Sequence, residues 1–312
     1  MRGNVTPPAL VAPSPANPVC SPLMVPAPVE LSIIIPMYRE AARIAPTLQD
    51  VFATLDHRGR PAELILVDDG SDDETLTVVR ALTARAPACV RVRIVPHPAN
   101  RGKGAAVRTG LAVATGAWRL MMDADNACRL SEAFALLART GPGVGMVAGS
   151  RVAPGARVAA VLHRKLVGGG FRLALRALGL RLLRDTQCGF KLYRADVAAQ
   201  VARHALEDGY VFDLEHLLIV RAAGLRVEEV GVRWVHMGGG RVSPLRDGLR
   251  MLLAARKLSR RWRTQPPAID RLPALMAPAV VVELKMGVQP PLSTESGGMM
   301  AIPTRIGESE PG

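Results

Sequence analysis

The sequence predicts an α/β protein in which helices cover both faces of a mostly parallel sheet. The first observation behind this prediction is an alternation, from residue 31 to residue 148, of short segments that are apolar throughout with helical segments. Strands buried on both faces of a parallel sheet have that composition. The second observation is that acidic or polar residues follow several of these strands, at the edge where such sheets bind ligands.

The expected strands and helices alternate along the chain. The first strand, Leu31–Ile35, is expected to stop at Pro36, because proline has no N–H to give to a sheet. The other strands are expected at Glu63–Val67, Arg91–Val95, Trp118–Met122 and Val144–Ala148. The helices between them are expected at Ala42–Leu55, Asp73–Ala84, Gly104–Ala114 and Ser131–Ala138.

The chain of 312 residues is expected to hold one ordered domain, over residues 29–243. Residues 1–28 contain eight prolines and are expected to form a disordered arm, which also lacks the compact apolar centre of a signal peptide. A basic amphipathic helix is expected over residues 244–264 and a flexible tail over residues 265–312. No run approaches the roughly 20 apolar residues that span a bilayer, which indicates a soluble or peripheral protein.

The charge of the chain bears on its partners. Forty lysines and arginines against 27 acids give a net charge of +13. Because no basic motif is interleaved with stacking aromatic residues, we expect an anionic membrane surface or a phosphate substrate as the partner, and no nucleic acid. Cys20, Cys89, Cys128 and Cys188 are scattered without metal-binding spacing, which indicates reduced thiols in the cytoplasm.

Two basic segments are expected to form helices that lie on a membrane. Between Arg157 and Arg184, five basic residues would fall on about a third of a helical circumference. They are Arg157, Arg164, Lys165, Arg172 and Arg176. A second helix follows Pro244, carries Arg246, Arg250, Lys257 and Arg261 on one side, and has Trp262 near its end. Such stripes are typical of the bilayer interface, although two ordinary surface helices fit the same pattern.

Two carboxylates, Asp123 and Asp125, follow the apolar strand that ends at Met122. Side chains at positions i and i+2 of an extended segment point the same way, so both carboxylates can face one cation. Hard cations such as Mg²⁺ and Mn²⁺ take oxygen ligands and are often shared with substrate phosphates. The sequence therefore predicts a metal-bound diphosphate at Asp123 and Asp125.

Two other strand ends carry candidate binding residues. Asp68, at the end of a buried strand, costs free energy unless a ligand such as a base or ribose uses it, whereas Ser71 or Asp72 could simply cap the next helix. The turn Gly102-Lys103-Gly104 is not a Walker loop. Its backbone N–H groups, at a helix start, could bind an anion, or the segment could be a plain turn.

The later acids leave alternatives open. Asp185 could be a general base, or a turn carboxylate paired with Arg184. Asp213 and Glu215 form a second acid pair, and carboxylates of that kind also favour a helix N-terminus without any catalytic role.

Taken together, several motifs resemble those of the inverting family 2 glycosyltransferases, which have the Rossmann-like GT-A fold. The motifs are Ile35–Glu40, Val67–Ser71, Asn100–Gly110, Asp123–Asp125, Gly149–Arg151 and Asp185–Lys191. The resemblance extends from about Leu31 to Arg263 and is greatest in the branch that acts on polyprenyl and dolichyl phosphates, above all to dolichyl-phosphate glucosyltransferases.

The resemblance implies which residues would bind each substrate. A nucleotide-sugar donor would contact Pro36, Tyr38, Glu40, Asp68, Asp69, Lys103 and Asp123. A Mg²⁺ or Mn²⁺ ion on Asp123 and Asp125 would carry its diphosphate, and Asp185 would take the place of the base. The phosphate of the acceptor would bind Arg151, Arg164, Lys191 and Arg194.

The implied reaction moves a hexose, with inversion, onto a polyprenyl phosphate at the cytoplasmic face of a membrane. The expected donor is UDP-glucose, and the alternatives are GDP-mannose or a saccharide acceptor. A nucleotide-binding membrane adaptor without activity is the remaining alternative. The chain departs from the resemblance at Asn126, where relatives usually have glycine, and at Gly239-Gly240-Arg241, where they have Gly-Ser-Lys. Its proline-rich arm also stands where eukaryotic relatives carry a membrane helix.

Overall fold

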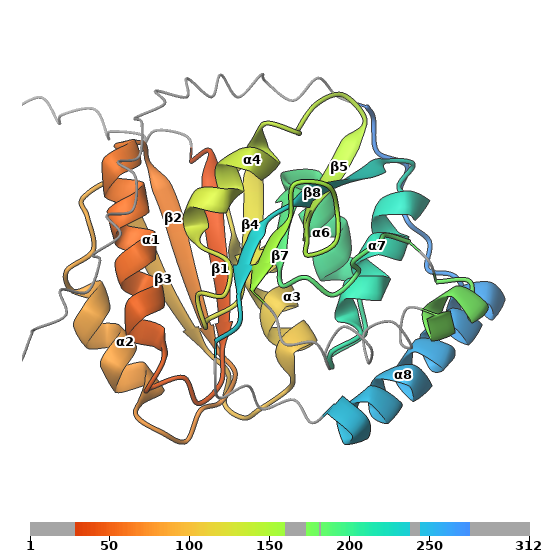
Figure 1. Ribbon diagram of the computed structural model, residues 1–312, viewed down its shortest axis with the longest axis horizontal. Helices are drawn as coiled ribbons and strands as arrows, with labels where there is room; N and C mark the ends of the chain where they lie inside the picture. The colour runs from red at the N-terminus through yellow and green to blue at the C-terminus, as the bar shows by residue number, and fades with distance from the viewer. Residues whose placement is uncertain (1–28, 160–172, 181, 238–243, 275–312) are drawn as a thin grey trace, which may run out of the picture. The chain divides into compact units, whose positions relative to one another are not determined.

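The computed structural model describes residues 29–159, 173–180, 182–237 and 244–274, and these all fall within one compact unit. The main sheet has seven strands in the order β3-β2-β1-β4-β7-β5-β8 (Figure 1). Their bounds are Leu31–Met37 (β1), Ala62–Asp68 (β2), Val90–Pro96 (β3), Trp118–Met122 (β4), Val144–Ser150 (β5), Phe190–Arg194 (β7) and Arg226–Gly231 (β8). Only β7 runs antiparallel to its neighbours, β4 and β5, so the predicted mostly parallel α/β sheet is confirmed.

The prediction that Pro36 ends the first strand is wrong. Strand β1 continues to Met37, and Pro36 lies opposite Val67 of β2. On its other side the pairing with β4 already ends at Ile34. The missing N–H of Pro36 therefore removes no ladder bond on that side, which is why a proline is accepted at this position.

The helices are arranged in two layers around the sheet. Their bounds are Ile44–Arg58 (α1), Thr75–Thr83 (α2), Lys103–Val113 (α3), Ala133–Leu137 (α4), Ala195–His204 (α6), Phe212–Ala222 (α7) and Pro244–Thr264 (α8). Helices α3, α6 and α7 pack together on one face, and α1 lies on the other with α2 and α4 (Figure 1). The helix predicted over Ser131–Ala138 is shorter, because a 3₁₀ turn, Leu130–Glu132, replaces its first turn.

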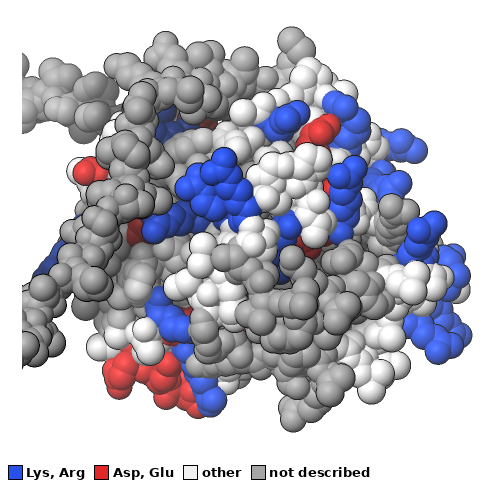
Figure 2. Space-filling model, in the orientation of Figure 1, with Lys and Arg blue, Asp and Glu red and all other residues white. Residues whose placement is uncertain are grey.

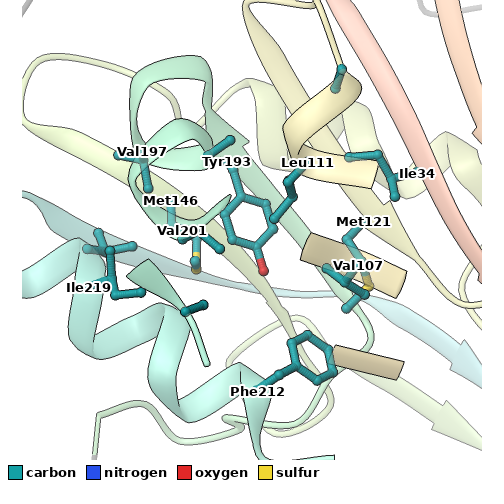
Figure 3. Close-up of a cluster of buried hydrophobic side chains, with 14 of the residues drawn as sticks. Ile34, Val107, Leu111, Met121, Met146, Tyr193, Val197, Val201, Phe212 and Ile219 are labelled. Atoms are coloured by element: carbon teal, nitrogen blue, oxygen red, sulfur yellow. The ribbon is translucent and has the colours of Figure 1, made fainter. Parts of the chain in front are cut away.

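The main hydrophobic core lies between the sheet and the layer of α3, α6 and α7 (Figure 3). Ile34 and Met121 contribute from neighbouring strands, and Val107 and Leu111 contribute from the buried side of α3. Tyr193 of β7 is fully buried among them and its hydroxyl meets His216 Nδ1 at 3.0 Å. This core holds α3 in place against the sheet that contains β4. The candidate site lies at the start of α3 and just beyond the end of β4.

The first predicted basic helix is contradicted at its start. Arg157 lies in a short strand, β6 (Arg157–Ala159), which pairs in parallel with β9 (Arg233–Val235). Residues 173–177 form a separate helical segment that contains Arg176. Arg164, Lys165 and Arg172 lie outside the described residues. Arg157 and Arg176 therefore do not share one helical face.

The second basic helix, α8, has the predicted bounds but is partly a core element. Ala255 and Leu258 are buried, and Trp262, which we expected at a membrane interface, packs against the core. Arg261 pairs with the buried Glu215 of α7. The expected flexible tail is also packed where it begins, since Leu272 donates its N–H to Ala223 O at 3.0 Å.

No helix within the described ranges has the length and apolar character needed to cross a membrane. Within the same ranges Cys89, Cys128 and Cys188 are free thiols.

Candidate active site

A cavity of about 410 Å³ opens at the carboxyl ends of β1, β2 and β4. Its position follows from the strand order: β2 lies on one side of β1 and β4 on the other, so the connections diverge there. Ligands of open α/β sheets bind at such a switch point. The lining residues come from the ends of these strands, from the glycine turn before α3 and from the loop before α7. They are Pro36, Met37, Tyr38, Glu40, Arg43, Asp69, Asn100, Gly102, Lys103, Ala106, Asp123, Ala124, Asp125, Gly209 and Tyr210.

Asp123 and Asp125, the predicted metal ligands, both line this cavity. Burial raises the pKa of Asp125, and the charge of Asp123 raises it further. Ala127 N–H donates to Asp125 Oδ1 at 3.1 Å and orients the carboxylate. Two partly buried acids that repel each other are a site that a cation would stabilise.

Lys103 is the cation that faces this acid pair. Its Nζ lies 2.5 Å from Asp123 Oδ1. Burial alone would lower the pKa of Lys103, but the carboxylates of Asp123, Asp213 and Asp125 outweigh it and raise the pKa well above the usual value. Lys103 is therefore permanently charged at physiological pH and can bind an anion that enters the cavity.

The departure at Asn126 has a physical reason. Asn126 has φ 56°, the left-handed region in which glycine and asparagine are the residues most easily accommodated. Asparagine can therefore adopt the backbone conformation that this position requires.

Two backbone N–H groups of the glycine turn, those of Gly102 and Gly104, are bound within the protein. Gly104 N–H donates to Asp208 O at 2.7 Å, and Gly102 N–H donates to Asp69 Oδ2 at 2.8 Å. A Cβ at Gly104 would lie 2.2 Å from Glu207 O, so glycine is needed because the loop before α7 lies against the turn. The two glycine N–H groups therefore hold the turn in place, and Lys103 supplies positive charge to the cavity.

The carboxylates of Asp68 and Asp69 are both hydrogen-bonded to other groups of the protein. Asp68 accepts hydrogen bonds from Ser71 N–H and Ser71 Oγ and is 1% exposed. Asp69 Oδ1 lies 2.8 Å from Nδ1 of the buried His97, and its two oxygens also accept the N–H groups of Arg101 and Gly102. Asp69 lines the cavity, but both carboxylates chiefly hold the turns that form it.

The end of β1 contributes one side of the cavity. Pro36, Tyr38 and Glu40, the residues predicted to bind the nucleotide, line it. The sequence reasoning missed Arg43, which also lines it and binds Glu40 through two contacts, of 2.9 and 2.6 Å. The sequence did offer a signal for this pair, because residues three apart at the start of a helix, such as Glu40 and Arg43, can contact each other.

Asp185 lies outside the cavity and pairs with Arg151, not with Arg184. Arg151 donates to it from Nε at 2.7 Å, from Nη2 at 2.9 Å and from its backbone N–H at 3.0 Å. Burial alone would raise the pKa of Asp185, but Arg151 outweighs this effect and lowers it. The carboxylate is therefore held ionised and is a weak proton acceptor.

The predicted acceptor cations are not assembled as expected. Lys191 is fully buried and lies 2.7 Å from Asp213 Oδ1. Arg194 pairs with Asp196 and lies opposite Trp118, at the far end of β4 from the acid pair. Arg151 is bound to Asp185, and Arg164 lies outside the described residues. The partners of Arg151 and Lys191 come from distant segments, which the sequence pattern does not reveal, whereas Asp196 follows Arg194 by only two residues.

The second acid pair has a structural role. Asp213 neutralises Lys191, which also donates to Cys188 O. Glu215 accepts the N–H groups of Leu206 and Glu207, at 2.8 and 2.7 Å. Neither acid lines the cavity. The loop that they hold, however, brings Gly209 and Tyr210 to the cavity, and the sequence had given no signal for these two residues.

The acids of the cavity fit a divalent metal ion only if a bound ligand supplies the remaining oxygen atoms of its coordination shell. Among the described residues, no group of three or more His, Cys, Asp or Glu side chains is arranged to hold a metal ion. Asp123 and Asp125 offer oxygen donors on one side, with room in the cavity on the other. That is the donor set of a Mg²⁺ or Mn²⁺ ion shared with a diphosphate.

An acid pair and a lysine at the switch point of a mostly parallel sheet are typical of nucleotide-binding enzymes. The chain belongs to glycosyltransferase family 2, because the profile of that family, described as Glycosyl transferase family 2, matches residues 32–201. The predicted family is therefore confirmed, and the protein is an enzyme.

The chain is also similar to proteins named dolichyl-phosphate beta-glucosyltransferase. The Drosophila melanogaster protein is 32% identical over 75% of this chain and 77% of its own. The Saccharomyces cerevisiae protein is 30% identical over 71% of each chain. The predicted resemblance to the branch that acts on dolichyl phosphates is thus confirmed.

Solved structures show the same fold at lower identity. Glucosyl-3-phosphoglycerate synthase from Mycobacterium tuberculosis, in complex with Mn²⁺, uridine diphosphate and glucosyl-3-phosphoglycerate, has a TM-score of 0.54. It is 21% identical, covering 77% of this chain and 81% of its own. At this identity the likeness concerns the fold, and it confirms the GT-A architecture.

Proposed function

We propose that the protein transfers a hexose from a nucleotide sugar to a polyprenyl phosphate, with inversion and with the help of Mg²⁺ or Mn²⁺. The observation that carries the proposal is the placement of Asp123, Asp125 and Lys103 in one cavity at the switch point of the sheet. The names of the relatives support dolichyl or a similar polyprenyl phosphate as acceptor and glucose as the sugar. The uridine diphosphate and Mn²⁺ bound to the structural neighbour support UDP-glucose as donor.

In this proposal the donor lies in the cavity with its nucleoside near β1 and its diphosphate near β4. Pro36, Tyr38 and Glu40 would contact the nucleoside part. Asp123 and Asp125 would hold the metal ion, which supplies neutralisation of the charge that develops on the leaving diphosphate. Lys103 would leave Asp123 for a phosphate oxygen, because its charge is fixed and its side chain is long enough to turn.

The transfer itself needs little proton chemistry. An oxygen of the acceptor phosphate forms a bond to the anomeric carbon while the bond from that carbon to the diphosphate breaks, and the nucleoside diphosphate leaves with the electron pair. A phosphate monoester has its second pKa near ~6, so its oxygen is largely ionised at neutral pH. The low pKa of Asp185 beside Arg151 is compatible with this chemistry, since no base is required. Asp185 would position Arg151 and the neighbouring turn.

The exposed side of α8 supports attachment to an anionic membrane surface, which we assign to the cytoplasmic face. Leu249 and Leu253 are 61% and 58% exposed, one helical turn apart. Arg256, Lys257, Arg260 and Arg263 are exposed beyond them along the helix. Figure 2 shows the corresponding gathering of basic side chains on the right, where Figure 1 shows α8. Exposed leucines beside cations are typical of a helix that lies in an anionic interface.

A transfer assay tests the proposal. The purified chain would be incubated with undecaprenyl phosphate or dolichyl phosphate, Mn²⁺ and one radiolabelled donor at a time, namely UDP-glucose, UDP-galactose or GDP-mannose. We expect label from UDP-glucose to enter the lipid extract, and the label to need the metal ion. Label from GDP-mannose alone would replace the donor in the proposal. No label from any donor, together with transfer to a soluble saccharide, would refute the polyprenyl acceptor.

A further inference from the structure

A groove of about 340 Å³ lies beside the turn that contains Asp185, and none of the roles above uses it. Most of its lining is aliphatic: Val152, Leu173, Leu175, Leu180 and Leu183. Leu173 and Val152 are 69% and 48% exposed. Side chains of this kind, open to solvent and gathered around a depression, indicate a surface that an apolar ligand covers.

Two cations complete the lining of the groove, Arg176 and Arg184. Both are exposed, and neither side chain makes an ion pair or hydrogen bond within the part of the chain that the structure describes. Arg184 is held in place by its backbone, because its N–H and that of Asp185 donate to the carboxylate of Glu229 at 3.2 and 2.8 Å. The groove thus offers positive charge at an otherwise apolar wall.

The groove is close to the cavity along the chain. Thr186 is buried and lines the groove. Three residues later, Gly189 packs against the acid pair, since a Cβ at Gly189 would lie 2.0 Å from Asp123 Oδ2. Three residues span at most about 10 Å. A ligand in the groove can therefore place a polar end near the position of the diphosphate.

We infer that this groove binds the acceptor of the reaction, with the isoprenoid chain on its aliphatic wall and the phosphate on Arg176 and Arg184. The inference rests on the function proposed above and adds to it the site of the second substrate. It assigns the acceptor phosphate to cations other than Arg151, Lys191 and Arg194, while Arg164 lies outside the described residues. Arg184 lies beside the Arg151–Asp185 pair, so the acceptor phosphate would approach the sugar from the side of that pair.

The chemistry of the lining favours a lipid phosphate over other acceptors. A sugar presents hydroxyl groups that need buried hydrogen-bond partners, and an aliphatic wall provides few of them. A nucleic acid would be held by aromatic stacking, and the groove is lined by no aromatic side chain among the described residues. A prenyl chain with a terminal phosphate matches both the aliphatic wall and the paired arginines.

Kinetics with two short acceptors test the inference on the full-length protein. The acceptors are citronellyl phosphate, which has an isoprenoid chain, and ethyl phosphate, which has none. The double variant Val152→Ser/Leu173→Ser should raise KM for citronellyl phosphate about 10-fold, because the isoprenoid chain loses aliphatic surface to pack against. It should leave KM for the nucleotide sugar and kcat/KM for ethyl phosphate unchanged. Arg184→Gln should raise KM for both phosphates about 10-fold, as loss of a charged hydrogen bond does.

Matched controls come from the same chain. Leu206→Ser removes a leucine of similar exposure, 64%, that lies outside the groove. Arg91→Gln removes an exposed arginine on β3. Both controls should behave as the wild type. If the groove variants and the controls change KM equally, or if Val152→Ser/Leu173→Ser weakens use of ethyl phosphate as much as that of citronellyl phosphate, the inference is wrong.

A binding readout separates failure of this inference from failure of the proposed reaction. A farnesyl phosphate with a benzophenone at its end should crosslink to the groove, and the peptides could be mapped by mass spectrometry. Crosslinks confined to other elements, such as α8, would overturn the inference even if sugar transfer is observed. A second outcome would also overturn the inference. If the groove variants lose binding to phosphatidylglycerol vesicles that lack polyprenyl phosphate as strongly as they lose binding to the lipid phosphate, the groove contacts bulk lipid. Absence of transfer by the wild type to every polyprenyl phosphate would instead refute the reaction itself.

Discussion

Three carboxylates near the cavity differ in the charge that each faces. Asp125 is partly buried next to another acid, Asp123, so its pKa is raised and a cation would stabilise its ionised form. Asp185 is also buried, but Arg151 contacts it through two side-chain nitrogens and lowers its pKa. The pKa shifts of the two acids are therefore opposite in direction, because Asp185 is ion-paired with Arg151 whereas Asp125 faces another carboxylate.

This contrast leads to a prediction for two isosteric variants. Asp125→Asn should lower turnover by roughly 10²–10³-fold, because the metal that neutralises the leaving diphosphate loses a ligand. Asp185→Asn should lower turnover by much less, since a phosphate acceptor is already ionised. The measurement is kcat for each variant at saturating donor and acceptor. Comparable losses in the two variants would contradict the assignment and would indicate a hydroxyl acceptor that needs Asp185 as base.

The lowered pKa of Asp185 also predicts how stability depends on pH. A carboxyl whose folded-state pKa lies below its unfolded value, about 3.9, stabilises the fold at pH above that value. This contribution is lost as the pH falls through the lowered folded-state pKa. Asp185→Asn should therefore be less stable than the wild type at pH 6, with the difference shrinking below about pH 4. Urea denaturation at several pH values measures this, and a constant difference down to pH 2 would contradict it.

At the scale of elements, the turn between Asp185 and β7 connects the two halves of the site. Gly189 lies against the carboxylate of Asp123, and Lys191 behind it binds both Cys188 O and Asp213 of α7. The turn is thereby held from behind by a buried ion pair and meets the acid pair in front. A change in this turn should affect cation binding without removing a ligand.

Gly189→Ala tests this contact directly. Its methyl group would lie 2.0 Å from Asp123 Oδ2, so either the carboxylate or the turn must shift. We expect the affinity for Mn²⁺ in the presence of uridine diphosphate to fall at least about 10-fold, with little change in thermal stability. Gly141→Ala is the control, because a Cβ there would meet nothing within 4 Å. Equal affinities in both variants would show that the contact does not matter.

The buried pair behind the turn calls for a double-mutant cycle. Lys191→Met or Asp213→Leu alone should destabilise the protein by about 3–5 kcal/mol, because each leaves an unpaired charge in the interior. The double variant should recover much of this loss, since it buries no charge. Chemical denaturation measures all three variants. Additive losses in the double variant would mean that the two side chains do not depend on each other.

At the scale of the whole molecule, α8 joins the core to an exposed basic surface. Arg261 and Trp262 are bound to the protein, whereas Leu249 and Leu253 face outward. Leu249→Ser/Leu253→Ser should weaken binding to anionic vesicles roughly 10-fold or more, because two leucines no longer enter the interface. Cosedimentation measures this, with Leu206→Ser as the matched control. Unchanged binding in the double variant would place the membrane contact elsewhere.

The alternation of apolar and helical segments was sufficient to predict the sheet and its helices, because burial on both faces leaves a clear pattern. The same reasoning identified the acid pair, since strand ends meet at one edge of a parallel sheet. It failed for Lys191, because its partner Asp213 lies on another element. It also failed for Arg194, although its partner Asp196 follows by only two residues. It also missed His97 and Tyr210, whose roles depend on contacts between distant loops.

The most direct test of the account is a titration of Mn²⁺, followed by its electron paramagnetic resonance signal, in the presence of uridine diphosphate. The account predicts that the wild type binds the ion only weakly alone and at least about 10-fold more tightly with the nucleotide, because two carboxylates leave its shell incomplete. Asp125→Asn should abolish this gain. Equal binding of Mn²⁺ by the wild type and by Asp125→Asn, with the nucleotide present, would contradict the central claim that the acid pair and the diphosphate share one metal ion.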